Sequence, residues 1–164
     1  MSSEGASNNE RLLAAARSDS EELLLEVLNG GDFDINFKDG VGMTALHYAA
    51  SLGSTDVLEH ILEQDECDVD PINRLEKATP LHLALRDLKD PEVRSYVVKS
   101  LVEAGADCTI KDKNGDTAMD LLQPQDEELR RFIRKTQAQN SVSRGDIADD
   151  DDDEGSAGSG SESE

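Results

Sequence analysis

The sequence has no tryptophan and only five aromatic residues, three Phe and two Tyr, among its 164 positions. Because aromatic side chains fill the centre of most large cores, a single bulky core is excluded, and the chain must pack Leu, Val, Ala and Ile in thin layers. No window is apolar enough to span a bilayer, and the first residues, MSSEGASN, lack the basic start and apolar run of a secretory signal. The sequence thus predicts a protein of the cytoplasm, the nucleus or both, with no membrane partner.

Basic residues are scarce as well: 16 Lys and Arg stand against 37 Asp and Glu, which gives a formal net charge of −21. Phosphate binding needs clustered cations, so direct binding to nucleic acid is not expected, and a basic protein is the better electrostatic partner. Nine of the acidic residues, and no basic residue, lie between Asp146 and Glu164. This segment has too few apolar side chains to form a core. We expect a disordered acidic tail over residues 138–164 and a flexible N-terminus over residues 1–9.

Two cysteines are present, Cys67 and Cys108, 41 positions apart, with no C-x-x-C pair and no histidine at ligand spacing. That pattern argues against a zinc site and favours small buried hydrophobic side chains. The pair Gly30-Gly31 precedes the strand-like stretch DFDINF, so it lacks the following helix that a phosphate-binding loop requires. We therefore predict no metal site and no cofactor.

One heptapeptide motif, the repeated word, occurs three times along the chain. TALHYAA begins at Thr44, TPLHLAL at Thr79 and TAMDLLQ at Thr117, so the copies are 35 and 38 residues apart. The first and third copies follow DGVGM and DKNGD, which share the pattern D-x-x-G-x before the Thr. A period of roughly 33 residues with a T-P-L-H-x-A word is typical of a solenoid of helical repeats. Two independent copies of the same junction therefore indicate a repeat architecture.

A second helical pattern accompanies each word. After the first word, Val57 to Leu62 places apolar residues at helical spacing. After the second word, Asp90-Pro91 reads as an N-cap followed by a proline at the first helical position. Upstream, residues 10–17 and 21–28 read as a short Ala-rich helix and its partner. Downstream, the third word has lost its His, and Pro124 interrupts its helix early.

These words, junctions and helix pairs resemble ankyrin repeats. The resemblance implies an all-α ankyrin-repeat solenoid, in which helix–turn–helix units are joined by short β-hairpin loops. It places the repeat domain at residues 10–137. Terminal units of a solenoid are atypical because one face meets water, which fits the divergent first and last units. The four expected units are residues 10–39, 40–73, 74–112 and 113–137.

Two features depart from the family pattern. In the junction RLEKAT, Arg74 and Lys77 stand where the family prefers Asp and Gly, so we expect that hairpin to differ in shape. The stretch RDLKDPEVRSY, Arg86 to Tyr96, is longer than the usual connection between inner and outer helix. Insertions in repeat proteins fall on loops, so this one lengthens either a loop or a helix.

The Thr and His residues of the repeated word have structural roles by this resemblance. Thr44 and Thr79 stand at helix starts, where a hydroxyl satisfies a free backbone amide. In ankyrin repeats the His hydrogen-bonds within and between units, which makes His47 and His82 structural. A catalytic role would require a nucleophile or acid partner in a closed pocket, and the sequence supplies neither. His60, on an outer helix, reads as a solvated residue, and we expect no catalytic residue and no enzyme.

Function is therefore expected at the surface. Solenoids offer partners an extended concave face, which in ankyrin repeats consists of hairpin tips and inner helices, and apolar anchors surrounded by polar groups are the usual hot spots. Phe37 and Leu83 lie on this side but are also candidates for the core between units. The predicted partner-binding residues are Val41, Met43, Tyr48, Leu52, Arg74, Leu75, Lys77, Arg86 and Lys113.

The leading hypothesis is a non-enzymatic protein-binding module, monomeric on its own. Its concave face would hold one client while the acidic tail attracts a basic region of that client, as an escort for a ribosomal or other nucleic-acid-binding protein would. The alternative is an inhibitor or regulatory subunit that covers the working face of an enzyme. In a third interpretation the tail binds bases of the concave face, Arg74 and Lys77 included, and keeps the site closed.

Overall fold

The computed structural model describes residues 7–143, and these residues form helices and loops with no strand. The chain divides into two compact units, Met1–Arg130 and Arg131–Glu164. The first unit contains every helix up to residue 130, including the first four residues of the last helix. The described part of the second unit is residues 131–143, which continue that helix. The helices are α1 (Asn8–Ser18), α2 (Glu21–Gly30), α3 (Ala45–Leu52), α4 (Thr55–Leu62), α5 (Pro80–Asp87), α6 (Pro91–Glu103), α7 (Ala118–Leu121), the 3-10 helix η1 (Pro124–Asp126) and α8 (Glu127–Ser143).

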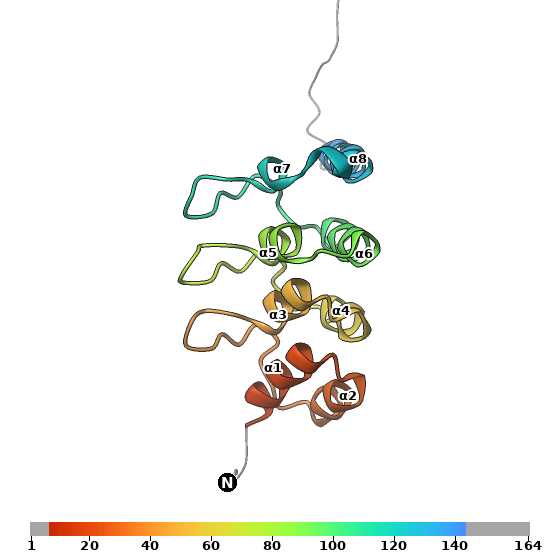
Figure 1. Ribbon diagram of the computed structural model, residues 1–164. Coiled ribbons are helices and arrows are strands. Elements are labelled where there is room, and N and C mark those ends of the chain that lie inside the picture. Colours follow the sequence, from red (N-terminus) through yellow and green to blue (C-terminus); the bar gives the residue numbers. More distant parts are fainter. Residues whose placement is uncertain (1–6, 144–164) are drawn as a thin grey trace, which may run out of the picture. The chain divides into compact units, whose positions relative to one another are not determined.

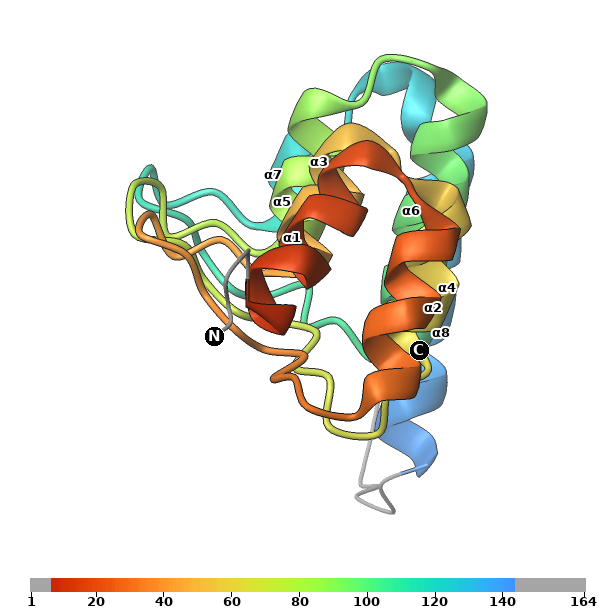
Figure 2. The same ribbon diagram turned by 90° about the horizontal axis from the view of Figure 1, so that it is seen from below.

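The first unit is a stack of helix pairs. The inner helices contact one another in chain order, α1 with α3, α3 with α5 and α5 with α7, and the outer helices do the same, α2 with α4 and α4 with α6. Figures 1 and 2 show the inner helices between the outer helices and three loops that project from the same side of the stack. The all-α solenoid expected from the sequence is confirmed.

Small side chains make the layers thin. Ala45, Ala49 and Ala50 on α3 are fully buried, and Leu46 and Leu81 fill the space between inner helices at 1% exposure each. Alanine lets neighbouring backbones approach closely, and each fully buried Leu contributes about 2 kcal/mol of hydrophobic stabilisation. Leu83 belongs to this core at 2% exposure, because α5 is packed against α3, α6 and α7. It is therefore not a partner-binding residue.

Polar contacts fix the register between the first two layers. The hydroxyl of Ser54 donates to the backbone oxygen of Ala16 at 2.6 Å. The Oδ1 atom of Asp19 accepts from the backbone N–H of Asp56, at 3.0 Å, and so caps α4 from the layer below. Burial and the nearby Asp56 carboxylate raise the pKa of Asp19 above its usual value. Each layer thus completes hydrogen bonds of its neighbour, as expected for units that are unstable alone.

The three loops share one turn, built on the side-chain oxygen of a single residue. Asp39 Oδ1 accepts from the N–H groups of Val41 and Met43, both at 3.0 Å, and Asp112 Oδ1 repeats this pattern two layers later. In the middle loop Asn73, not Arg74, has this role, since its Oδ1 accepts from the N–H groups of residues 76 and 78. The middle loop is one residue longer, so the predicted alignment of Arg74 with Asp was wrong by one position.

The difference in shape expected for this hairpin is the one additional residue, since the turn closes from Asn73 to Ala78. Lys77 adopts a positive φ of 51°, the left-handed conformation that glycine adopts in the other two loops. The loops pair by turn hydrogen bonds, such as that from the Asp39 N–H to the Met43 oxygen at 3.0 Å. They are hairpin-like turns without strands.

Two glycines with nearly equal backbone angles provide a matched stability test. Gly42 and Gly115 have φ of 84° and 83°. A Cβ on Gly42 would lie 2.8 Å from the backbone N of Arg74, whereas a Cβ on Gly115 would meet nothing within 4 Å. We expect Gly115→Ala to cost about 1 kcal/mol of unfolding free energy from backbone strain alone and Gly42→Ala about 2 kcal/mol because a clash is added. Urea unfolding measures both, and equal losses would contradict the close packing of the first two loops.

The element bounds refine the expected domain limits. Helix α1 begins at Asn8 with Ser7 as its N-cap, two residues before the predicted start of the repeats. Helix α8 continues to Ser143, so the predicted start of the tail, residue 138, lies within a helix. Residues 144–164, which hold the acidic stretch, lie outside the described residues. The long connection after α5 is a short extended link from Leu88 followed by the 13-residue α6.

Candidate functional site

The histidines of the repeated word are buried parts of the framework. His47 Nδ1 accepts from the backbone N–H of Thr44 at 3.0 Å, and the Thr44 hydroxyl in turn accepts from the His47 N–H at 3.2 Å. On the other side of the ring, Nε2 lies 2.9 Å from the backbone oxygen of Ala78 in the next layer. Since Nδ1 accepts, Nε2 carries the proton and donates it to Ala78. The single imidazole thus caps its own helix and ties two layers together.

His82 repeats this arrangement one layer further along. Its Nδ1 accepts from the Thr79 N–H at 3.1 Å, and its Nε2 lies 2.9 Å from the backbone oxygen of Asp116. His47 and His82 are 0% and 1% exposed. Both nitrogens of each ring are therefore engaged by the backbone, and both rings are buried.

The protonation of His47 should couple folding to pH. Burial lowers its pKa below 6.5, against the opposing effect of the hydrogen bond to Ala78. A lowered folded-state pKa means that the unfolded chain takes up the proton first, so this residue's contribution to stability is present above about pH 6.5 and is lost as the pH falls. We expect the unfolding free energy of His47→Gln to vary less between pH 7 and pH 5 than that of the native chain. Equal pH dependence in chemical unfolding would contradict this.

The third histidine and the two cysteines are also hydrogen-bonded or unreactive. His60 is half-buried rather than solvated, with its Nε2 2.8 Å from Glu21 Oε2 of the preceding layer. Burial raises the pKa of Cys67 and of Cys108 to about 11, which disfavours the reactive thiolate. Within residues 7–143, no group of three or more His, Cys, Asp or Glu side chains is placed to hold a metal ion.

An inner-face cluster joins the first two layers. Asp39 accepts a hydrogen bond from the Tyr48 hydroxyl, and the Arg17 guanidinium lies 5.2 Å from the centre of the Tyr48 ring. Although burial alone would raise the pKa of Asp39, the hydrogen bonds from Tyr48 and from two backbone N–H groups lower it below its usual value. Tyr48 is thus held in one orientation, with part of its ring exposed on the inner face.

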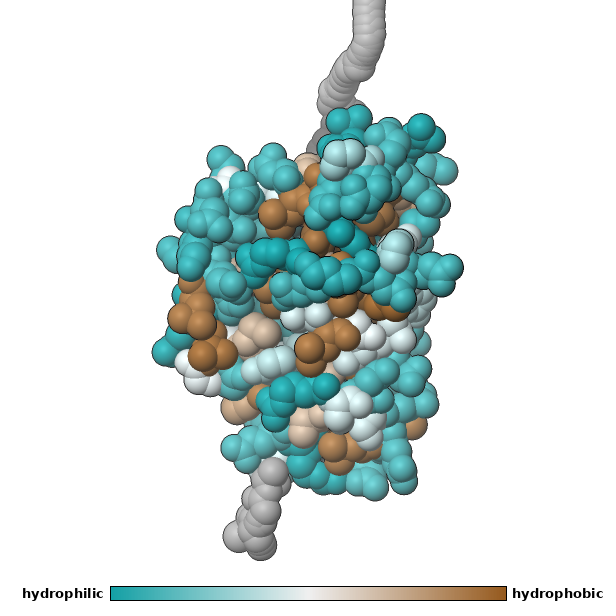
Figure 3. Space-filling view, viewed as in Figure 1, coloured by the Kyte–Doolittle hydropathy of each residue, from teal (hydrophilic) through white to brown (hydrophobic). Residues whose placement is uncertain are grey.

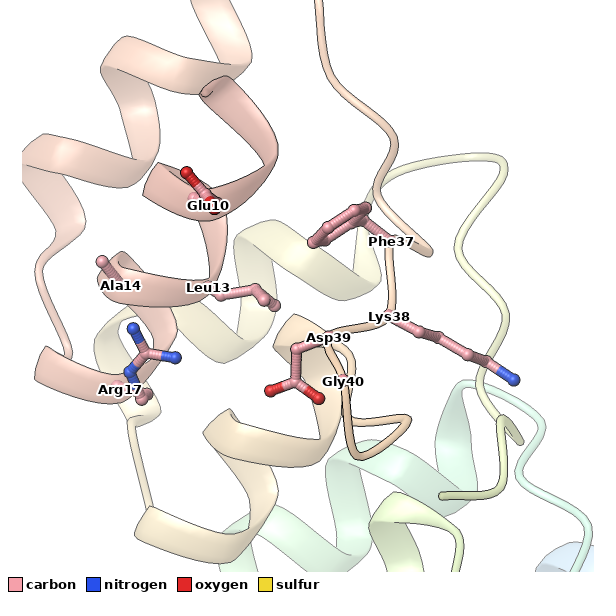
Figure 4. Close-up of a pocket in the computed structure, with 8 residues that line it drawn as sticks. All are labelled: Glu10, Leu13, Ala14, Arg17, Phe37, Lys38, Asp39 and Gly40. Atoms are coloured by element: carbon pink, nitrogen blue, oxygen red, sulfur yellow. The ribbon is translucent and has the colours of Figure 1, made fainter. Parts of the chain in front are cut away.

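Beside this cluster lies a cavity of about 660 Å³ between α1 and the first loop. Figure 4 shows the side chains of Leu13 and Phe37 directed into this space, while Lys38 points away from α1. Sequence reasoning missed the site because α1 and the loop are separate in the chain and meet only through stacking. Its lining combines apolar side chains, Leu13 and Phe37 among them, with charged ones. The lining residues are Glu10, Leu13, Ala14, Arg17, Phe37, Lys38, Asp39 and Gly40.

The tips of the first two loops form a second exposed feature. Val41 is 42% exposed and Leu75 is 68% exposed. The backbone N–H of Arg74 donates to the oxygen of Val41 at 2.9 Å, and that of Lys113 to the oxygen of Glu76 at 2.8 Å. These bonds hold the tips of adjacent loops side by side. In Figure 3, one of several hydrophobic patches on this face lies at the loop edge.

The structure brings some of the predicted partner-binding residues together and separates others. Val41, Arg74, Leu75, Lys77 and Lys113, all exposed, make up the loop tips.

The other predicted residues lie around these tips or are partly occupied. Met43 is half-buried, with its sulfur 3.4 Å from Asn73 Nδ2. Arg86 pairs with Glu76 at 2.9 Å, so its positive charge is partly neutralised. Leu52 is 56% exposed but lies at the far end of α3. Ile72, 43% exposed before the middle loop, was missed, although an isolated apolar residue beside a turn is a usable signal.

No described helix is both long enough and apolar enough to cross a membrane.

Comparison with known proteins gives consistent matches. The family model for ankyrin repeats, in three copies, matches residues 12–112. An ankyrin repeat-containing protein of Saccharomyces cerevisiae is 39% identical over 132 residues, covering 74% of this chain and 73% of that protein. An E3 ubiquitin-protein ligase of Caenorhabditis elegans is 28% identical over 110 residues, but these are 67% of this chain and 4% of the ligase. The crystal structure of an ankyrin repeat protein superposes with a TM-score of 0.64 at 32% identity, covering 78% of this chain and 62% of that one.

Proposed function

Because this chain belongs to the ankyrin-repeat family, a non-enzymatic fold for protein–protein interaction, we propose that it holds a protein partner on its inner face. The surface consists of the loop tips, Tyr48 and the cavity between α1 and the first loop. The observation that carries this proposal is that Val41 and Leu75 stay largely exposed on a framework held in place by backbone hydrogen bonds. Exposed apolar anchors on a rigid support are typical of binding hot spots.

The partner is a protein with a basic region, and the chain acts as its escort. The charge of −21 supports this, as does the acidic stretch after Asp146, since acidic segments compete with nucleic acid for Lys and Arg. The protein acts as a monomer in the cytoplasm, the nucleus or both. A chain ending after Ser143, where α8 ends, should bind such a client at least tenfold more weakly at low salt. Equal affinity and equal salt dependence with and without residues 144–164 would exclude the tail from client binding.

The inner face itself is tested by a matched pair of variants. Val41→Ser with Leu75→Ser should weaken capture of the client at least tenfold, because central apolar anchors carry much of the energy of an interface. Leu25→Ser is the control, since Leu25 is 37% exposed on the outer helix α2. Should the outer-helix variant weaken binding and the loop-tip variant not, the surface is on the other side of the molecule.

A second function remains open, that of an inhibitor covering the working face of an enzyme. The cavity between α1 and the first loop favours it, because a recess of about 660 Å³ can accept a protruding side chain of such an enzyme. This function predicts that the chain ending after Ser143 inhibits as well as the full chain, and that Tyr48→Ala with Leu52→Ala abolishes inhibition.

A further inference from the structure

Every exposed charged residue in the turns of the three loops is basic. The turns are residues 38–43, 73–78 and 111–116. Their exposed charged residues, which together with Val41 and Leu75 make up the loop edge, are Lys38, Arg74, Lys77, Lys111 and Lys113. The acidic residues of the same turns are half-buried or buried, and they are Asp39, Glu76, Asp112 and Asp116. The loop edge therefore presents positive charge, although the chain has a net charge of −21.

Three of these acidic side chains hold the turns in shape. Asp39 accepts from the Tyr48 hydroxyl and from two backbone N–H groups. Glu76 pairs with Arg86 at 2.9 Å, and Asp112 is 6% exposed with its Oδ1 accepting from two N–H groups. Because these carboxylates are engaged below the surface, a ligand that approaches the loop edge meets the cations first.

Four of the five cations form no ion pair among residues 7–143, and they are Lys38, Arg74, Lys77 and Lys113. The fifth, Lys111, is partly occupied by the first residue after its own turn that carries an exposed acid. Hydrogen bonds from Thr117 and, to a smaller extent, the nearby Lys111 lower the pKa of Asp120. Positive charge is thus available to a partner mainly at the tips of the loops.

Apolar surface lies between these cations. Leu75 is 68% exposed and stands between Arg74 and Lys77 in the middle loop, and Val41 is 42% exposed in the first loop. The backbone N–H of Arg74 donates to the Val41 oxygen at 2.9 Å, which holds the two apolar tips in adjacent layers. The loop edge therefore combines charge recognition with apolar contact.

The stacking of the loops gives this surface a regular spacing. The Arg74 bond joins the first two loops, and the bond from the Lys113 N–H to the Glu76 oxygen, at 2.8 Å, joins the last two. Figure 1 shows the three loops one above another on the same side of the stack. Packed helices lie about 8–10 Å apart, and an extended chain advances about 10 Å in three residues. An extended segment along the loop edge would place every third residue opposite a successive loop.

We propose that the loop edge binds an extended segment of the partner in which acidic residues recur about every third position beside an apolar residue. The acidic side chains meet Arg74, Lys77 and Lys113, and the apolar side chain contacts Leu75. The inference rests on the proposed function, because it names the chemistry that the same surface recognises. The client then has two charged parts, a basic region drawn to the acidic stretch after Asp146 and an acidic segment held by the loop tips.

The test uses the full chain and a synthetic peptide of eight residues, with Leu at the third and sixth positions and Asp at the others. Exposed ion pairs are individually weak, so the peptide is titrated to millimolar concentration while backbone amide shifts are recorded. We expect shift changes at residues 74–77 and 113–115 and none in α2. At 1 M salt, where the screening length falls to about 3 Å, the affinity should fall at least fivefold.

A matched peptide and matched variants make the result specific. The peptide with Ser in place of both Leu residues should bind at least threefold more weakly, because it lacks the apolar anchor. Lys113→Gln should lower the affinity at least twofold, and the triple variant Arg74→Gln, Lys77→Gln and Lys113→Gln at least tenfold. Lys89→Gln, which removes an exposed cation at the connection between α5 and α6, should leave it unchanged.

Three outcomes overturn the inference. They are the absence of shift changes at the loop tips, an unchanged affinity in the triple variant, and loop-tip amides that shift with the concentration of the chain alone. The last would assign the loop edge to a second copy of this chain.

The inference and the proposed function can fail separately. If the peptide does not bind but Val41→Ser with Leu75→Ser loses the client, the proposed function stands and the acidic segment is wrong. If the peptide binds at the loop tips but the same double variant captures the client unimpaired, the acid-binding surface stands and the client is held elsewhere.

Discussion

Replacing Asp126 by Ala is expected to lower the unfolding free energy by about 4 kcal/mol. Asp126 Oδ2 lies 2.9 Å from Arg94 Nη2, and both side chains are only 8% exposed. Within the described residues neither Nε nor Nη2 of Arg94 makes a hydrogen bond of good geometry, so the attraction of the carboxylate at 2.9 Å is the main compensation for this buried charge. Without it, a guanidinium remains in a site where water does not reach it, and the folded state is penalised accordingly.

Removing the other partner should cost less. In Arg94→Met the carboxylate of Asp126 still accepts from the backbone N–H of Gln123 at 2.8 Å, so we expect a loss of about 2 kcal/mol. The double variant Arg94→Met with Asp126→Ala should be more stable than Asp126→Ala alone, because no uncompensated charge is left. Urea unfolding of the three variants forms a double-mutant cycle. Additive losses would show that the two groups do not interact.

The damage in Asp126→Ala should be concentrated in the last layer. Arg94 lies on α6 and Asp126 on η1, so this ion pair links the third layer to the start of the fourth. Units of a solenoid contact only their neighbours, and a terminal layer can therefore open by itself. We expect faster amide hydrogen exchange in residues 118–130 and nearly unchanged exchange in α3. Uniform acceleration throughout would contradict a layered distribution of stability.

The second large effect is expected for His47→Ala, which should lower the unfolding free energy by about 3 kcal/mol. This substitution leaves the Ala78 oxygen and the Thr44 N–H without their buried partners and opens a cavity in a fully buried position, and both changes are destabilising. Because the bond to Ala78 crosses between layers, the variant should also unfold less cooperatively. Calorimetry and urea unfolding measure the two effects.

Two controls separate the structural role from the mere presence of an imidazole. His60→Ala removes a partly exposed pair with Glu21, in which the side chains are 29% and 54% exposed, and should cost at most about 1 kcal/mol. Asp120 stands at the His position of the third word and caps Thr117 through Oδ2, with no contact to a further repeat among residues 7–143. Asp120→Ala should therefore destabilise less than His47→Ala. If His60→Ala were as damaging as His47→Ala, the inter-layer role of the buried ring would be wrong.

The repeated heptapeptide motif made it possible to predict the stacked helix pairs and where the inner helices begin. Thr44 and Thr79 are N-caps as the sequence indicated, because capping depends on residues three positions apart, and such local rules can be read from a sequence. The middle loop was misaligned since an inserted residue moved the turn-forming side chain from Arg74 to Asn73. An Asn before a turn was visible in the sequence, but the Thr-based alignment concealed it.

Other features depend on residues that stacking brings together. The pair of Arg94 and Asp126 joins positions far apart in sequence, and each residue alone looks like an ordinary charge on a helix. The cavity beside Phe37 arises in the same way, from α1 and a loop that meet in adjacent layers. Exposure could not be predicted for Leu83 either, since a helix buried on both sides leaves no polar stripe to mark its outer face.

The loop tips, and not the outer helices, are the proposed partner-binding surface. The most direct measurement places a photocrosslinking amino acid at Leu75, and separately at Leu25, in the full chain in its own cells. The two positions are 68% and 37% exposed. Leu75 is on the loop before α5 and Leu25 is on α2, and Figure 2 shows the loops and α2 on opposite sides of the inner helices. A discrete protein adduct formed from position 75 and not from position 25 is the predicted result. An adduct from position 25 alone, or from neither position, would contradict the claim.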